Sequence, residues 1–410
     1  MTLREDAEHI MKAALFSALP DTAVKEALKE MAPVKGKLIL IAVGKAAWQM
    51  SKAAIDELGS SVTQGIVITK YNHIKGNLPN IKCYEAGHPI PDANSYSATQ
   101  EALKLVSDLT EDDVVLFLIS GGGSALFESP LISGEELQSI TEKLLASGAD
   151  IVEMNTIRKR LSAVKGGRFA LACAPAKVFS VVLSDIIGDP LDMIASGPAY
   201  PDSSTCEQAF QIIENYKIPL STEAKAFLEK ETPKLLKNVE THITGSVKQL
   251  CESAQKEALK LGYKTIYLSS SLCCQAKEAG SFLASIARDH QDTKDSLAFI
   301  CGGETVVQLT GSGKGGRNQE LALSAAQGIS GLEQTAIFSL GSDGTDGPTD
   351  AAGGYVDGDT SAKLLKKGIL ISHVLQQNDA YHALAQCNGL IMTGPTGTNV
   401  NDLSVVLIKR

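Results

Sequence analysis

Glycine-rich turns, isolated cations and paired aspartates follow several apolar runs in this sequence. The apolar run 115–119 leads into a turn formed by Gly121, Gly122, Gly123 and Ser124. Three consecutive glycines tolerate positive φ angles and let backbone N–H groups approach an anion closely. A tight turn could need glycine for its dihedral angles alone, but it rarely needs three in a row. The pattern therefore favours a phosphate-binding turn.

Three cations stand where they could meet an anion. Lys45 follows an apolar run at the start of a predicted helix, where an ammonium can neutralise charge on a transferring phosphoryl group. Lys165 lies in the strongly basic segment 154–170 and precedes two glycines. Arg317 follows the glycine-rich segment 311–316. For Lys45 and Lys165, a solvated surface position is an equally good interpretation.

The segment 311–316 formally matches the pattern GxGxxG, but the match is weak. A dinucleotide-binding fingerprint requires an acidic residue about 20 residues further on, and Asp343 is too distant to be that residue. The phosphate-binding pattern GxxxxGK[ST] does not occur in the chain. A flexible turn is the simple interpretation, whereas Lys314 and Arg317 beside four glycines favour an anion contact.

Carboxylates follow two of the apolar runs. Asp185 and Asp189 come after the run 178–183, and Asp343 comes after a later run. Paired carboxylates at strand ends suit Mg²⁺ or a base for a substrate hydroxyl, although aspartates also cap helices and close turns. We expect one functional aspartate in each of these two places. Asn399 closes a polar, turn-forming loop before the last apolar run.

The apolar runs alternate with amphipathic helical stretches, as in sheets whose strands are buried on both faces by crossover helices. The sequence therefore predicts an α/β fold with two α/β domains and largely parallel sheets. A polar segment at 219–237 places the boundary between domains 1–235 and 236–410. Open sheets of this kind bind ligands beyond the carboxyl ends of their strands. The expected strands are 38–43, 66–69, 114–119 and 178–183 in the first domain, and 242–244, 265–268, 297–301, 305–309, 336–340 and 405–408 in the second.

Composition limits the partners of the chain. A net charge of -9 over 410 residues argues against nucleic acid, and the longest apolar runs are far shorter than a membrane span. No signal-peptide pattern opens the sequence, and eight cysteines without metal-ligand spacing indicate reduced thiols, so we expect a cytoplasmic protein. His88 and the other histidines lack triad spacing, and a structural role is the simplest interpretation. A homodimer is compatible with the sequence.

Several long segments closely resemble the type-2 glycerate kinase family, whose members carry a MOFRL domain at the C-terminus. The resemblance runs from about residue 38 to the end of the chain. The segments that carry it are GHPIPDANS (87–95), LISGGGSALF (118–127), NTIRKRLSAVKGGRFA (155–170), VLSDIIGDPLDMIASGPAYPD (182–202), GGETVVQLTGSGKGGRNQELAL (302–323), GSDGTDGPTDAAGG (341–354) and TGPTGTNVNDL (393–403).

The resemblance implies an ATP-dependent kinase that converts D-glycerate to 2-phosphoglycerate with Mg²⁺, in a cleft between two α/β domains. It implies that Lys45 and Arg317 stabilise charge and that Asp189 draws the proton from the glycerate hydroxyl. It assigns metal binding, or the water shell of the metal, to Asp185, Glu304 and Asp343. It assigns ATP or phosphate binding to Gly121, Gly122, Gly123, Ser124, Lys165 and Asn399, with the glycine turn expected to hold the nucleotide.

One turn departs from the family pattern. Leu340 to Gly344 reads LGSDG, where the resemblance leads us to expect a turn similar to SAGTDG. The aspartate and the glycine are kept, but the role of Asp343 is open. The alternative function is an NAD(P)-dependent hydroxypyruvate reductase, a name that members of this family also carry. The chain lacks the dinucleotide fingerprint that a reductase would need.

Overall fold

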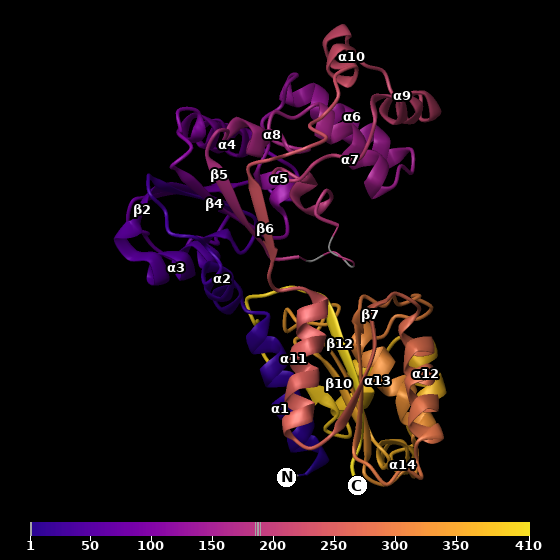
Figure 1. Ribbon diagram of the computed structural model, residues 1–410. Coiled ribbons are helices and arrows are strands. Elements are labelled where there is room, and N and C mark those ends of the chain that lie inside the picture. The colour runs from indigo at the N-terminus through magenta and orange to yellow at the C-terminus, as the bar shows by residue number, and fades with distance from the viewer. Residues whose placement is uncertain (1, 185, 187, 189) are drawn as a thin grey trace. The chain divides into compact units, whose positions relative to one another are not determined.

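The computed structural model describes residues 2–184, 186, 188 and 190–410 (Figure 1). The chain divides into two compact units. The N-terminal unit comprises the described residues of 23–244, apart from 186 and 188. The C-terminal unit comprises residues 2–22 and 245–410 together with those two residues. No helix of the described residues is long and apolar enough to cross a bilayer.

A six-stranded sheet forms the core of the N-terminal unit. Its strand order is β3-β2-β1-β4-β5-β6, and every neighbouring pair is parallel. The strands β1 and β4 are runs of Val, Ile, Leu and Phe that are almost wholly buried, as central strands covered on both faces must be. The strands are β1 (Leu38–Val43), β2 (Val62–Lys70), β3 (Ile81–Ala86), β4 (Val114–Ile119), β5 (Lys177–Val182) and β6 (Val239–Ile243).

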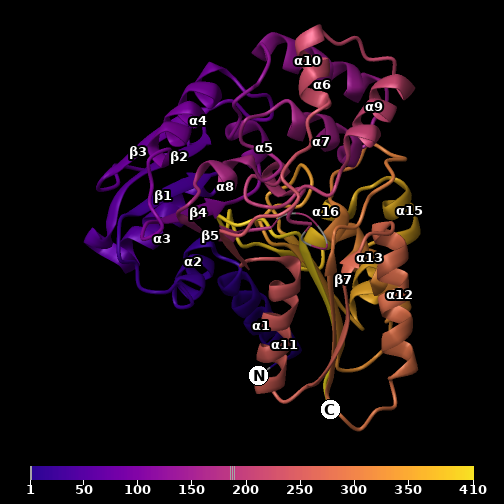
Figure 2. The same ribbon diagram turned by 45° about the horizontal axis from the view of Figure 1, so that its top comes forward.

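Helices cover both faces of this sheet. Figure 2 shows α3 on one side of the sheet and α4 on the other. The crossover through α3 runs from β1 to β2, and the crossover through α4 runs back from β3 to β4. Right-handed crossovers in opposite directions place their helices on opposite faces of the sheet. Several of these helices have a side-chain cap at their N-terminus. Asp92 caps α4 and Asp150 caps α7, each by accepting a backbone N–H of the first turn. The helices are α2 (Pro20–Leu28), α3 (Ala47–Leu58), α4 (Ala93–Val106), α5 (Gly123–Leu126), α6 (Gly134–Ala146), α7 (Ile151–Arg160), α8 (Arg168–Ala172), α9 (Cys206–Asn215) and α10 (Thr222–Leu228), with 3-10 turns η1 (Gly59–Ser61) and η2 (Ile194–Ser196).

The C-terminal unit is built on a second six-stranded sheet, in the order β11-β10-β9-β12-β8-β7. Only β7 and β8 are parallel among these neighbours, and the other four pairs are antiparallel. The last strand of the chain, β12, lies between β8 and β9, and all seven of its residues are buried. The strands are β7 (Lys264–Leu272), β8 (Leu297–Gly303), β9 (Thr335–Gly341), β10 (Gly353–Asp357), β11 (Leu390–Ile391) and β12 (Asp402–Ile408).

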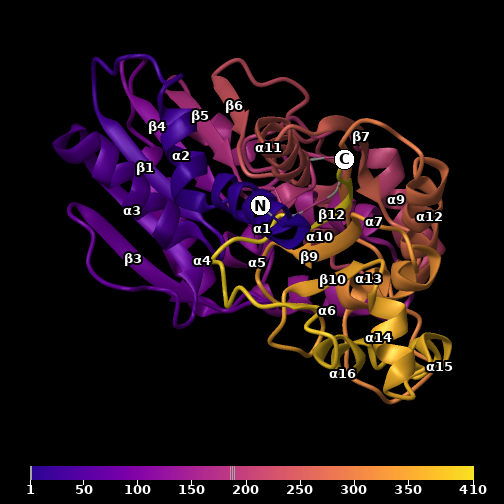
Figure 3. The same cartoon turned by 90° about the horizontal axis from the view of Figure 1, so that it is seen from below.

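Two pairs of helices pack on this sheet. Helices α1 and α11 lie side by side on one face, and α12 and α13 lie side by side on the other (Figures 1 and 3). Leu283 of α12 and Leu321 of α13 share an apolar core with Phe299 and Val406 of the sheet. The helices are α1 (Leu3–Ser17), α11 (Val247–Lys260), α12 (Ala276–Asp289), α13 (Arg317–Gly328), α14 (Thr360–Lys366), α15 (Ile371–Gln376) and α16 (Ala380–Ala385).

The predicted α/β class with two sheets is confirmed, but one predicted strand belongs to the other sheet and another is absent. The segment near 242–244 belongs to β6, which completes the N-terminal sheet by pairing with β5, instead of opening a second series. The N-terminal unit therefore extends beyond residue 235. The segment 305–309 is not a strand, because β8 ends at Gly303 and only Val306 forms an isolated bridge.

Candidate functional site

The carboxyl ends of β1 and β4 form the topological switch point of the N-terminal sheet. From β1 the chain proceeds through β2 to β3 at one edge, and it then returns to the other side of β1 as β4. Loops that leave two such strands in opposite directions open a crevice, where open α/β sheets bind ligands. Lys45 follows β1 and the turn Gly121–Gly123 follows β4. The structure thus brings these two sequence candidates together.

Close backbone contacts fix the two turns to each other. The Lys45 N–H donates to the Gly121 carbonyl at 2.9 Å, and the Ala46 N–H donates to Ser120 Oγ at 3.0 Å. Gly44 has a φ of +117°, and a Cβ at this position would lie 2.3 Å from Ser120 Oγ. Only glycine fits both the dihedral angle and the space. The position of Lys45 is therefore set by its backbone.

The groups left open at this place are donors and a cation. The Lys45 side chain is exposed and, among the described residues, no carboxylate forms an ion pair with it. The amides of Gly121 and Gly122 donate to no acceptor in the described part of the chain, and both residues are partly exposed. Open N–H groups beside an ammonium are suited to a phosphate or a carboxylate.

His88 also faces this turn, although sequence reasoning treated it as structural. A Cβ on Gly122 would lie 3.1 Å from His88 Nε2 and 3.2 Å from the Lys45 Cγ, so both side chains pack against this glycine. Burial, and then the charge of Lys45, lower the pKa of His88, which favours the neutral imidazole. The signal that could have identified His88 was its place in the segment GHPIPDANS, next to a turn-forming proline.

Buried polar contacts support the other end of the turn. The Ser196 hydroxyl donates to Asn155 Oδ1 at 2.8 Å and lies 3.2 Å from the Ser124 hydroxyl. Arg158 Nη2 donates to the Ser124 carbonyl at 2.9 Å. Ala195 and Ser196 have φ angles of +52° and +61°, which are costly for residues other than glycine. Asn155 and Arg158 lie in the basic segment 154–170, but sequence reasoning gave none of these partners of Ser124 a role of its own.

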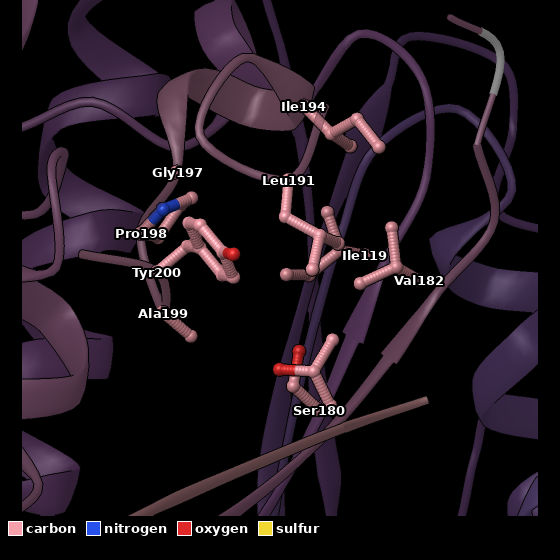
Figure 4. Close-up of a pocket in the computed structure, with 10 residues that line it drawn as sticks. Ile119, Ser180, Val182, Leu191, Ile194, Gly197, Pro198, Ala199 and Tyr200 are labelled. Atoms are coloured by element: carbon pink, nitrogen blue, oxygen red, sulfur yellow. The ribbon is translucent and has the colours of Figure 1, made fainter. Parts of the chain in front are cut away.

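The hollow beside η2 is too small for a substrate. Its walls are apolar, and Figure 4 shows Ile119, Leu191 and Ile194 directed into it, with Ser180 below. Its volume of about 10 Å³ is the space of a single water molecule. Substrates of this unit must therefore bind outside it.

The structure gives Lys165 a purely internal setting. The residue is fully buried, and its ammonium donates to the Phe127 carbonyl at 2.8 Å and lies 3.1 Å from Glu128 Oε2. Burial lowers the pKa of Lys165 to about 8, against the opposing effect of Glu128. The following Gly166 and Gly167 donate to carbonyls of residues 196 and 197. The cation and the glycines thus stabilise the fold instead of facing a ligand.

Arg317 begins α13 in the C-terminal unit, within a nest of carboxylates. Its Nε and Nη2 donate to the two oxygens of Asp402 at 2.6 and 3.0 Å, and its Nη1 donates to Glu304 at 3.0 Å. Burial acts to lower the pKa of Arg317, but Asp402 and Glu304 have the larger effect and raise this pKa. Asp346 caps the same helix by accepting the backbone N–H groups of residues 318 and 319. Sequence reasoning missed Asp402 and Asp346.

Asp343 and Asp402 lie near Gly341 at the end of β9. A Cβ on Gly341 would lie 2.8 Å from the Thr345 carbonyl oxygen, 3.4 Å from Asp343 Oδ1 and 3.5 Å from Asp402 Oδ1. Three oxygens therefore converge where only a glycine leaves room. Within the described ranges, no group of three or more His, Cys, Asp or Glu side chains is arranged to hold a metal ion. Asp185 and Asp189 lie outside the described residues.

The glycine-rich segment 311–316 differs from the turn at Gly121, because three of its amides already have protein partners. The N–H of Gly311 donates to Asn378 Oδ1, that of Gly313 to the Gln377 carbonyl, and that of Lys314 to Asp379 Oδ1. Its glycines permit close packing, since a Cβ on Gly313 would lie 2.5 Å from Gln377 and Asp379 atoms. The prediction of an anion contact through this segment is therefore not supported by its amides.

Asn399 is exposed, in the loop that packs on the Asp343 turn. The Thr396 N–H of this loop donates to the Asp343 carbonyl at 3.2 Å, and its hydroxyl donates to the Ser342 carbonyl. Asn399 Oδ1 accepts the N–H of Asn401. The loop thus holds the Asp343 turn in place.

The N-terminal unit has an open parallel α/β sheet, a fold whose members bind ligands at strand ends, and it carries an exposed lysine beside open amides at that place. Residues 6–229 match the family described as Domain of unknown function (DUF4147), and residues 297–402 match the MOFRL family. A D-glycerate 2-kinase of Thermotoga maritima is 51% identical, and the match covers 99% of each chain. The crystal structure of a glycerate kinase from that organism superposes with a TM-score of 0.95 at 50% identity, covering 99% of each chain.

A glycerate 2-kinase of Pyrococcus horikoshii is 41% identical over 100% of this chain and 98% of its own. A protein of Agrobacterium vitis with the provisional name hydroxypyruvate reductase is 37% identical over 100% of this chain and 95% of its own. The chain belongs to the MOFRL-containing family of these glycerate kinases. The resemblance seen in the sequence is thereby confirmed.

Proposed function

We propose that the protein transfers the γ-phosphoryl group of ATP to the 2-hydroxyl of D-glycerate, giving 2-phosphoglycerate and ADP. The observation that carries this proposal is the exposed Lys45 ammonium beside the open amides of Gly121 and Gly122 at the switch point. The substrates are inferred from the full-length similarity to a D-glycerate 2-kinase. Phosphoryl transfer depends mainly on positioning and on electrostatic stabilisation, which such groups supply.

Lys45 and the glycine turn bind anionic oxygens in this proposal. The ammonium neutralises charge that accumulates on the transferring phosphoryl oxygens, and the Gly121 and Gly122 amides donate hydrogen bonds to phosphate oxygens. Backbone contacts hold Lys45 and Gly121 in place before the substrate arrives. Such preorganisation lowers the reorganisation needed during the reaction.

Arg317 supplies a second, permanently charged group. The bidentate contact with Asp402 leaves its planar guanidinium little freedom of rotation. Nη1, which contacts the exposed Glu304, is the part of the group that a substrate oxygen can approach. We infer that Arg317 stabilises phosphate charge through this edge.

Mg²⁺ fits the oxygens around Gly341. Mg²⁺ needs one or two carboxylates and takes its other ligands from water and phosphate oxygens. Asp343 and the Thr345 carbonyl would hold it and Glu304 would contribute to its water shell, whereas both oxygens of Asp402 already accept hydrogen bonds from Arg317. When bound, the ion would neutralise phosphate charge. The other roles in the proposal, charge stabilisation and proton removal, belong to side chains of the protein.

We propose Asp189 as the base that takes the proton from the glycerate hydroxyl, on the strength of its motif. A general base contributes about 10²- to 10⁴-fold to the rate. We expect Asp189→Asn to lower kcat by such a factor, with the KM for ATP little changed. Steady-state kinetics with both substrates checks this. An unchanged kcat would remove Asp189 from the mechanism.

One pair of assays separates the kinase from the reductase alternative. The purified protein is incubated with D-glycerate and Mg-ATP, and separately with hydroxypyruvate and NADH. We expect ADP and 2-phosphoglycerate, identified by ³¹P NMR, in the first assay only. NADH consumption in the second assay without product in the first would refute the proposal. The amides of Gly311, Gly313 and Lys314 favour the kinase, because they are occupied by protein acceptors and are not open to a dinucleotide pyrophosphate.

A further inference from the structure

The C-terminal unit contains a pocket of about 820 Å³, within the size range of small-molecule sites. The segment 304–309 forms one wall, and the glycine-rich segment 311–316 forms another. Arg317 and Pro348 also line it. All the lining residues belong to this one unit. The pocket is therefore a property of the C-terminal unit itself.

The walls of this pocket are fixed before any ligand binds. Asn378 Oδ1 accepts the N–H groups of Thr310 and Gly311 at 2.7 and 2.9 Å, while Asn378 Nδ2 donates to Glu320 at 3.1 Å. Glu320 is almost fully buried in α13. A buried polar network thus fastens the glycine-rich wall to the helix that begins at Arg317. Such a wall can present a defined surface to a ligand.

Apolar side chains are exposed around the pocket. Leu309 is 80% exposed and Val306 is 55% exposed, and both line the pocket together with Val307 and Pro348. Glycerate carries three polar groups on three carbons and offers almost no apolar surface to such walls. A purine ring has two wide apolar faces. Clustered exposed apolar residues mark binding sites, and these match the nucleoside better than the acceptor.

The polar edge of the pocket matches the other end of a nucleotide. Arg317 and Glu304 line the same pocket as Leu309 and Val306. A nucleotide joins an aromatic base to a chain of phosphates, so its site needs an apolar part and a cationic part within one molecular length. The pocket offers both. The amides of Gly311, Gly313 and Lys314 are occupied by protein acceptors, so this part of the glycine-rich wall acts through shape instead of holding phosphate.

We propose that this pocket binds the base and ribose of the nucleotide, with Val306 and Leu309 packed against the base. The inference rests on the proposed kinase function for the identity of the nucleotide. It assigns the nucleoside to the C-terminal pocket.

The test measures ADP binding directly, so that it does not depend on turnover. Isothermal titration calorimetry with the full-length protein compares ADP and inorganic tripolyphosphate, which lacks a nucleoside. Leu309→Ser removes an apolar contact, and Val306→Trp fills the pocket. Leu365→Ser and Leu365→Trp are matched controls, because Leu365 is 62% exposed on α14 and does not line this pocket. Circular dichroism melting establishes that each variant is folded.

We expect Leu309→Ser to weaken ADP binding about tenfold, the effect of losing one buried leucine contact. Val306→Trp should abolish it, whereas the Leu365 variants and all affinities for tripolyphosphate should stay within twofold of the wild type. Unchanged ADP affinity in both pocket variants would overturn the inference, as would an equal loss of ADP and tripolyphosphate binding. ADP binding of this pattern without phosphorylation of glycerate would support the pocket and reject the kinase function.

Discussion

Lys45 and Lys165 carry the same ammonium group in opposite environments. Lys45 is exposed, and its backbone is fixed by the contact with Gly121. Lys165 is fully buried against Glu128 and the Phe127 carbonyl. A cation that contacts substrate should affect turnover more than folding, and a buried one should do the reverse. The two residues therefore allow opposite predictions.

Lys45→Ala should lower kcat/KM for phosphorylation of glycerate by about 10²- to 10³-fold, the usual cost of losing one preorganised charge-stabilising group. Because Lys45 is exposed, the melting temperature should change little. Steady-state kinetics and circular dichroism melting measure the two effects. Lys104→Ala, at an exposed position on α4, is the matched control and should behave as the wild type. Equal activity of the two variants would exclude Lys45 from the reaction.

The buried pair of Lys165 and Glu128 should make stability depend on pH. Burial lowers the pKa of Lys165 to about 8 in the folded state, whereas an unfolded lysine titrates near its ordinary value. Between these pH values the unfolded state binds more protons, so the free energy of unfolding rises as pH increases above about 8. The slope approaches about 1.4 kcal/mol per pH unit at most.

The reference for this measurement is the double variant Lys165→Met/Glu128→Gln, which has no titrating pair. Urea unfolding of both proteins at pH 7.5, 8.5 and 9.5 gives the difference between them. We expect the wild type to gain stability relative to the double variant as pH rises. A constant difference across this range would mean that Lys165 keeps its ordinary pKa.

At the scale of the element, the turn after β4 combines a backbone requirement with a packing requirement. Gly122 has a φ of +84°, and a Cβ there would press on His88 and Lys45. Gly148, which follows α6, has a φ of +81°, but a Cβ there would meet nothing within 4 Å. The two glycines thus share the dihedral strain and differ in their neighbours.

Gly122→Ala and Gly148→Ala should therefore lose similar stability, about 1–2 kcal/mol from the positive φ. Only Gly122→Ala should also lose activity, by about 10- to 100-fold, because it displaces Lys45 and His88. Urea unfolding and steady-state kinetics of both variants test this. A similar fall in activity in the two variants would show that strain, and not the position of Lys45, controls the rate.

The elements that the sequence predicted well are those with an unbroken apolar run. The strands β1 and β4 were predicted at their observed bounds, since six apolar residues in each leave little choice. The segment 305–309 (TVVQL) is only partly apolar and forms the wall of a pocket, because β12 and β7 already occupy both edges of β8. The hydrophobic periodicity of a segment does not show whether the neighbouring strand still has a free edge to pair with.

The residues of the candidate site also divide into those that local sequence predicted and those that it missed. Lys45 and the glycine turn were proposed from the sequence because each follows a predicted strand, and they remain predictions. Asp402 and His88 were missed, because each contacts a residue that lies far away in the sequence. Asp402 binds Arg317, and His88 packs against Gly122. Lys165 had the sequence pattern of an anion-binding residue, but burial decided its role. Local sequence does not encode burial by distant segments.

At the scale of the whole chain, the N-terminal helix belongs with the C-terminal sheet. Helix α1 packs against α11, and residues 2–22 group with residues 245–410. Asp6 of α1 is fully buried, where it accepts hydrogen bonds from the Tyr263 hydroxyl and the Lys409 ammonium, each at 2.7 Å. The amphipathic pattern of α1 predicts a helix but not the unit that it covers. The C-terminal unit is thus completed by the first residues of the chain.

Asp6→Ala should destabilise the C-terminal unit by about 2 kcal/mol, because it leaves the Tyr263 hydroxyl buried without its acceptor and removes the partner of Lys409. Asp21→Ala, at an exposed position of α2, is the matched control and should cost less than about 0.5 kcal/mol. Urea unfolding followed by hydrogen exchange of β9 and β12 locates the loss. Equal stability of the two variants, or faster exchange confined to β1 and β4, would contradict the assignment of α1 to the C-terminal unit.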